Sequence, residues 1–134
     1  MSQSVSDPQA LNQIRQHWSD QVRNLMSNIS AWAKEEGWPV VEEEKEMRDS
    51  LGAYNLPRLS IQLSNRNEIH VDPVFHVSAG RGRVDVSAIP TLNRVRLVED
   101  REFNGWKIVT DSNVPIRRIW EKRAFTDLVA DLLA

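Results

Sequence analysis

The sequence predicts an α+β fold, with a long N-terminal helix and a C-terminal helix packed on one face of an antiparallel meander of five or six strands. Three observations predict it. Apolar and polar residues alternate between Pro57 and Thr110, which is the period of a strand. Apolar residues recur every three or four positions over residues 8–36 and 121–133, which is the period of a helix. Turn-forming residues separate the alternating runs.

The first helix is expected from Pro8 to Glu36. Asp7 can accept hydrogen bonds from the free N–H groups of the first turn, and proline suits the first helical position. Gly37 then closes the helix, and Pro39 prevents its continuation. The apolar residues form one stripe along it: Leu11, Ile14, Trp18, Val22, Leu25, Ile29 and Trp32.

This helix would be longer than the sheet that it covers. At ~1.5 Å per residue it measures roughly 43 Å, whereas a strand of about six residues spans ~20 Å. Two explanations fit the mismatch. The helix breaks near Ser27-Asn28, or it overhangs the sheet and presents the start of its stripe, namely Leu11, Ile14 and Trp18, to a second copy or to another protein.

Five strands are expected between Pro57 and Thr110. Their polar face can remain in water, which favours antiparallel pairing. Pro73 interrupts the second of the alternating patterns and suggests an edge position or a bulge there. The expected turns are 64–67, 79–82, 89–92 and Asn104-Gly105.

Residues 38–47 contain the acidic run Glu42-Glu43-Glu44. They form either a sixth, edge strand, whose charges discourage aggregation, or a solvated loop. Consecutive glutamates lack the spacing and the glycine of a calcium loop, so we expect no metal here. Residues 48–56 read as a connection into the first central strand. After the meander, Pro115 begins a short irregular segment.

The polar face of the meander carries the candidate site residues. With tight turns between the strands, His76 lies opposite Asp85, and Asp85 in turn lies opposite Arg96. The same register places Ser87 opposite Arg94. A cross-strand row of His76, Asp85 and Arg96 results.

This row has three possible roles. Facing charges can simply fix the strand pairing. Arg83, Arg94 and Arg96 can instead grip a carboxylate, a phosphate or an acidic partner, since guanidinium groups match those anions. Finally, His76 held by Asp85 can serve as the general base of a hydrolase.

Other chemistries find little support. His70, Asp72 and His76 share a strand, but their spacing keeps them from converging on a metal unless the strand bends. We therefore expect neither a metal nor a cofactor. The arginines interleave with aliphatic residues rather than exposed aromatic ones, which argues against nucleic-acid binding.

The 134 residues contain no cysteine, which excludes disulfides and thiolate catalysis. The chain starts without the basic and apolar segments of a signal peptide, and no apolar run approaches the ~20 residues that cross a bilayer. We expect a single cytoplasmic domain over residues 1–134, with residues 1–6 as a disordered tail.

The leading functional hypothesis is a small protein-interaction module without catalytic activity, with a homodimer as one form. Trp38, between Gly37 and Pro39, is expected to be partly exposed and to join the arginines in partner binding. The alternative is a protein that binds a small anionic ligand in a pocket between helix and sheet. The second alternative is the hydrolase that uses His76 and Asp85.

Overall fold

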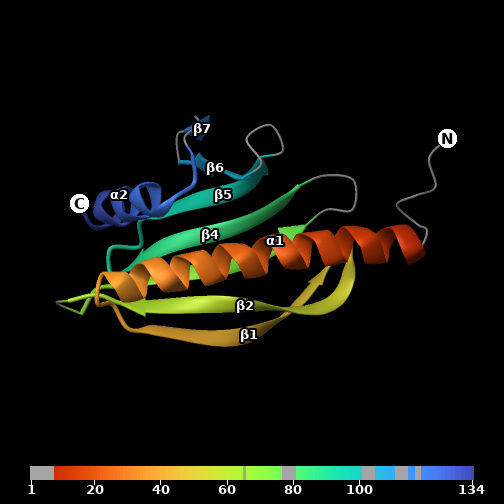
Figure 1. The fold of residues 1–134 in the computed structure, drawn as a ribbon, viewed down its shortest axis with the longest axis horizontal. Coiled ribbons are helices and arrows are strands. Elements are labelled where there is room, and N and C mark those ends of the chain that lie inside the picture. The colour runs from red at the N-terminus through yellow and green to blue at the C-terminus, as the bar shows by residue number, and fades with distance from the viewer. Residues whose placement is uncertain (1–7, 65, 77–80, 101–104, 111–114, 117–118) are drawn as a thin grey trace.

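The structure, a computed structural model, describes residues 8–64, 66–76, 81–100, 105–110, 115–116 and 119–134. The predicted disordered tail, residues 1–6, lies outside them. The chain forms a sheet layer and a helix layer (Figure 1). In chain order the elements are α1 Pro8–Glu35, β1 Val40–Asp49, β2 Gly52–Gln62, β3 Glu68–His76, β4 Gly82–Ile89, β5 Arg94–Asp100, β6 Gly105–Val109, β7 Pro115–Ile116 and α2 Lys122–Leu133.

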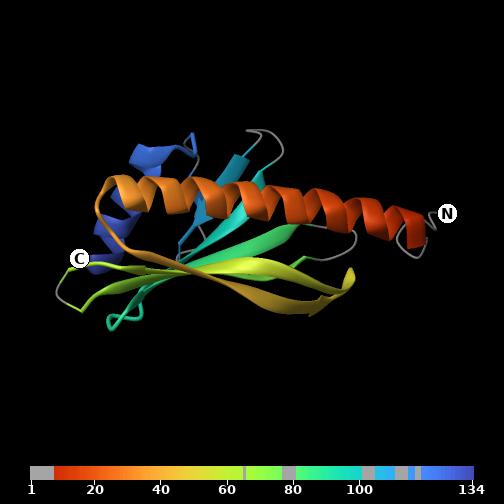
Figure 2. The same ribbon diagram turned by 60° about the horizontal axis from the view of Figure 1, so that its bottom comes forward.

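The sheet is an antiparallel meander, because the spatial order of its seven strands is their order in the chain. Both helices lie on the same face of it, as Figure 2 shows. The apolar residues that alternate along the central strands point to that face, where they form one buried core with the α1 stripe and with α2. The predicted fold class is therefore confirmed.

The sheet continues beyond the five predicted central strands. Residues 38–47 contribute most of β1, which is the edge strand, so the alternative of a solvated loop is wrong. At the other edge, the segment expected to be irregular forms the two-residue strand β7, which pairs with the end of β6.

The prediction of a connection over residues 48–56 is also wrong. β2 begins at Gly52, which pairs with Asp49 across a tight turn. The alternating pattern is broken in β2 because the successive residues Leu56 and Pro57 are both buried. A strand that changes its buried side in this way has no period-two signal in the sequence.

Helix α1 is continuous over 28 residues. It runs through Ser27 and Asn28, so the predicted break is wrong. Gly37 ends it in a left-handed conformation with φ of 82°. The next residue, Trp38, donates its N–H to the carbonyl of Ala33 at 2.9 Å, which satisfies one of the free carbonyls of the last turn.

The first turns of α1 extend past the ends of the strands, as the overhang explanation predicts (Figure 1). Leu11 and Ile14 are half-buried in this part and pack against the edge of the core. Trp18 is fully buried, so its inclusion in an exposed surplus is wrong.

Trp18 packs directly on the backbone of the sheet at Gly82. A Cβ atom at Gly82 would lie only 2.3 Å from Cζ3 of the Trp18 ring, so no larger residue fits without a shift. The same ring lies 5.2 Å from the His76 ring and 6.1 Å from the Trp106 ring, between centroids. Gly82 therefore allows α1 to approach the sheet closely.

We expect Gly82→Ala to lower the free energy of unfolding by about 1–3 kcal/mol, the usual effect of overpacking a core. Urea denaturation measures it. In a Trp18→Ala background the added methyl group has space, so the same substitution should cost almost nothing. An equal cost in both backgrounds would show that the ring is not the cause.

Candidate functional site on the uncovered sheet face

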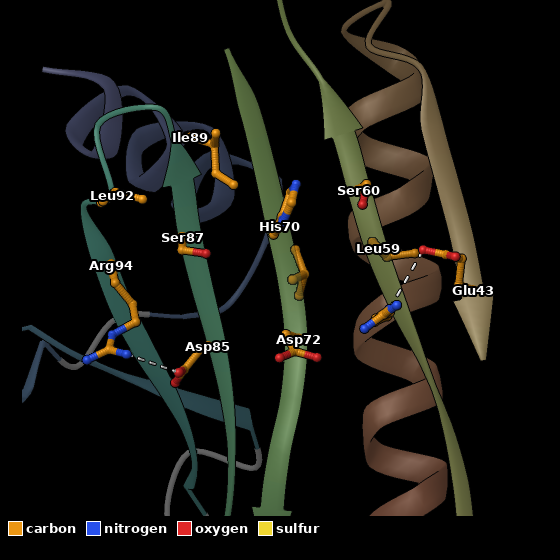
Figure 3. Close-up of a pocket in the computed structure, with 12 residues that line it drawn as sticks. Glu43, Leu59, Ser60, His70, Asp72, Asp85, Ser87, Ile89, Leu92 and Arg94 are labelled. Atoms are coloured by element: carbon orange, nitrogen blue, oxygen red, sulfur yellow. Dashed lines mark ion pairs between the residues drawn. The ribbon is translucent and has the colours of Figure 1, made fainter. Parts of the chain in front are cut away.

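The sheet face opposite the helices carries a row of polar side chains across four adjacent strands. Ser60 pairs with His70, His70 with Ser87, and Ser87 with Arg94. This row crosses an open hollow of about 560 Å³ on that face (Figure 3). The hollow is lined by Glu43, Arg58, Leu59, Ser60, His70, Val71, Asp72, Asp85, Ser87, Ile89, Leu92 and Arg94.

A second row of facing residues lies two residues further along β3, β4 and β5. Here Asp72 lies opposite Asp85, an arrangement of like charges that destabilises a sheet unless cations compensate it. Lys45 lies 2.9 Å from Asp72, and Arg83 donates two hydrogen bonds to Asp85, at 2.7 and 3.0 Å. The two carboxylates are therefore neutralised from opposite sides of the hollow.

Arg83 is committed to this pairing. The hydrogen bonds to Asp85 raise the pKa of Arg83 above its ordinary value, against the effect of burial. Its guanidinium also lies 5.9 Å from the centre of the Phe75 ring. Both contacts hold Arg83 in place, so it contributes more to the shape of the site than to free binding capacity.

Arg94 and Arg96 also differ in how far other contacts hold their side chains. The predicted register is confirmed, since Asp85 pairs with Arg96 and Ser87 with Arg94. The Arg96 side chain donates to the backbone carbonyl of Thr110 at 3.3 Å. The Arg94 side chain is 53% exposed, and its ion pair with Asp85 is long, at 3.7 Å. Arg94 is thus the better placed of the two to contact a ligand in the hollow.

His76 does not face Asp85, so that part of the predicted row is wrong. Asp72 occupies the position opposite Asp85, and a bulge between Pro73 and Phe75 then shifts the register by one residue and places His76 opposite Gly82. The shift turns the Phe75 side chain outward and leaves His76 only 3% exposed, on the helix side. His76 and Asp85 therefore lie on opposite faces of the sheet, and the predicted base and its orienting carboxylate do not meet.

His76 instead contacts Glu99 in the core, with 3.2 Å between Nε2 and Oε1. The Gly82 N–H donates to the same oxygen at 2.9 Å. Burial raises the pKa of Glu99, but the hydrogen bonds from His76 and Gly82 outweigh it and lower that pKa below its ordinary value. This pair lies in the part of the core where the His76 ring packs against Trp18. In the sequence, only the interruption of the alternating pattern at Pro73 indicates it.

Trp38 lies at the junction of the two helices. It is half-buried, and its ring meets that of Phe125 edge to face, with 6.3 Å between the centroids. Trp32 and Trp120 form a similar contact beside it, at 5.8 Å. Trp38 is therefore far from the arginines, and its role in partner binding stays a separate prediction.

Between α2 and the sheet lies a small cavity of about 90 Å³, lined by residues that include Val95, Ile108, Ala124 and Leu128. This volume is far below the ~300 Å³ at which small-molecule sites begin. Within the described ranges, no three His, Asp or Glu side chains gather into a metal site. No helix in the described part of the chain is long and apolar enough to span a membrane.

Sequence reasoning placed Ser87 opposite Arg94 correctly, but it considered His70 only as a metal ligand and missed Ser60 and the apolar end of the hollow. Ile89 and Leu92 were assigned to a turn, and the register that brings Ser60 beside His70 was not inferred. The available signal was a short side chain, Ser87, that faces longer side chains on both neighbouring strands. It can be recognised only when the registers of β2 with β3, of β3 with β4 and of β4 with β5 are all known.

Comparisons with protein-family models, with curated proteins and with solved structures gave no match.

The lowered pKa of Glu99 predicts a pH-dependent contribution to stability. A carboxyl group whose pKa falls on folding stabilises the protein above its unfolded pKa of ~4.3, and this contribution disappears as the pH falls through the folded value. We expect Glu99→Gln to lower the free energy of unfolding by about 1–3 kcal/mol at pH 7 and by much less at pH 3.

Urea denaturation at both pH values measures the difference. Glu68→Gln is the matched control, because Glu68 pairs with His70 at a similar 3.3 Å but on the exposed face. It should change stability little at either pH. A loss of stability in Glu99→Gln that is the same at pH 3 and pH 7 would contradict an ionised Glu99 carboxylate in the folded protein.

Proposed function

We propose that the protein is a cytoplasmic binding module without catalytic activity, and that its uncovered sheet face binds a protein partner. The observation that carries the proposal is that both helices cover one face, which leaves a hollow with polar lining on the other (Figures 2 and 3). Sheets with an open polar face are common, but an open hollow of this size on such a face offers a partner a shaped surface.

Apolar side chains surround the hollow. Val41, which pairs with Ser60 and so shares its face, is 58% exposed, and Leu92 is 76% exposed. Phe75 is turned outward by the bulge and is 37% exposed. Apolar and aromatic residues beside arginine are the composition that protein interfaces favour.

The charge on the β4 to β6 side of this face favours an acidic partner, whereas Glu43 and Asp72 line the other side of the hollow. On β4 to β6, Arg83, Arg94, Arg96 and Lys107 point outward, as their register partners show, against the single described carboxylate of Asp85. Such a surplus attracts a surface of opposite sign and speeds its association. A second copy can supply that surface, since β1 carries the acidic run Glu42-Glu43-Glu44.

A small anionic ligand is the second candidate, and one observation favours it. Arg94 stands beside Ser87 and His70, which places three hydrogen-bonding side chains next to one another in the hollow. The ligand site would then be the outer hollow rather than the filled space between helix and sheet.

Site-specific photocrosslinking in the native cells tests the partner proposal. With p-benzoylphenylalanine at Val41 or Leu92 we expect a discrete crosslinked product, and with the probe at Asn24, exposed on α1, we expect none. A product of twice the chain mass identifies a second copy, and any other mass identifies a different protein.

Arg94→Glu should reduce the Val41 crosslink about tenfold, because it reverses the charge that attracts the partner. Crosslinking from Asn24 as efficient as from Val41, or a Val41 product unaffected by Arg94→Glu, would overturn the proposed face.

A further inference from the structure

The floor of the hollow has a notch that suits one oxyanion. Ser87 is short and lies between two long side chains, His70 on β3 and Arg94 on β5. Facing residues on antiparallel strands have Cβ atoms about 5 Å apart, so the serine hydroxyl, the guanidinium and the imidazole can reach a single group between them. The arginine supplies two parallel N–H donors and the serine a third, which matches a carboxylate.

One end of this notch is apolar. Ile89 and Leu92 line the hollow beyond Ser87 and Arg94 (Figure 3). Leu92 is exposed on a turn in which its own backbone has φ of 65°, an unusual conformation for leucine. Its N–H donates to the Ala88 carbonyl at 2.8 Å, so the turn fixes the backbone from which this apolar side chain projects at the rim.

The turn is also anchored to α2. The Asn93 side chain donates to the carbonyl of Leu132 at 2.8 Å, and the Thr91 hydroxyl donates to the same carbonyl at 3.4 Å. Residues on both sides of Leu92 are thereby tied to the end of a packed helix. A binding surface that is ordered before the ligand arrives loses less entropy on binding.

The opposite end of the notch is acidic. Asp85 lies two residues before Ser87 on β4, facing Asp72 on β3. Both carboxylates would repel a ligand that carried negative charge in their direction. On the other side Glu68 faces Ile89 and lies 3.3 Å from Nε2 of His70. A bound anion is therefore confined to the level of Ser87 and Arg94, and the apolar contacts available to the rest of its molecule are Ile89 and Leu92.

We propose that the hollow binds the C-terminal residue of a partner polypeptide, with the terminal carboxylate on Arg94 and Ser87 and an apolar side chain on Ile89 and Leu92. The C-terminal residue is where a polypeptide carries a carboxylate and an apolar side chain on the same carbon. Side-chain carboxylates of Asp and Glu lack that apolar neighbour. This inference rests on the proposed function and specifies which part of the partner the face contacts.

NMR titration of the ¹⁵N-labelled full chain tests it with defined probes. A hexapeptide that ends in leucine should shift the amide signals of residues 87–94, and its C-terminal amide should bind at least tenfold more weakly. The same peptide ending in glycine tests the apolar end. N-acetyl-leucine shows whether a free small acid binds as well as a peptide.

Arg94→Gln should weaken the acid peptide to the level of the amide while leaving the amide unchanged. Leu92→Asn should abolish the preference for leucine over glycine and keep the requirement for the carboxylate, because asparagine tolerates the positive φ of the turn. Arg123→Gln, exposed on α2 and outside the hollow, is the matched control and should have little effect. Dispersed spectra confirm that each variant is folded.

Equal binding of acid and amide, an unchanged affinity in Arg94→Gln, or shifts that map away from the hollow would overturn the inference. If the Val41 probe forms crosslinks but the acid and amide forms of the hexapeptide bind equally, only this inference is rejected and the partner proposal remains supported. N-acetyl-leucine binding as tightly as the hexapeptide would also reject it, in favour of a small organic acid.

Discussion

The close contact of Trp18 with Gly82 determines which face of the sheet α1 covers and which face stays open. It brings α1 onto the sheet at a point where the backbone has no side chain, and the indole ring then meets His76 and Trp106 as well. Helix α1, the His76–Glu99 pair and strand β6 all pack around this one ring. Because α1 is fixed to this face, the polar face remains available to solvent and to other molecules.

The bulge after Pro73 separates two kinds of chemistry. One shift in register places His76 in the core, where its Nε2 pairs with Glu99, and places Phe75 on the polar face. The Gly82 N–H donates to the same Glu99 carboxylate. Without the shift His76 would lie on the polar face, although not beside Asp85, which faces Asp72. With it, the histidine that β3 keeps on the polar face is His70, between Ser60 and Ser87.

The fold could be predicted because each element had an intact periodic signal. The α1 stripe and the alternation of β4 and β5 were undisturbed, and so the registers of Arg94 and Arg96 were predicted correctly. The first half of the predicted turn 79–82 and Asn104 of the turn Asn104-Gly105 lie outside the described residues. Predictions failed where twist or a bulge changes the buried side of a strand, at Leu56 in β2 and at His76 in β3. The hollow itself could not be predicted, since its shape depends on how several strands and the turn at Leu92 lie relative to one another.

The sequential order of the strands also bears on synthesis. Each strand pairs with its neighbour in the chain, so the sheet can grow by adding one hairpin at a time. The first helix can meet β1 to β3 early, but the ring of Trp18 packs against Gly82 and Trp106 from β4 and β6. While the ribosome makes the chain, this one ring therefore stays without its final partners until most of the sheet has emerged, which is the interval in which a chaperone would be most useful.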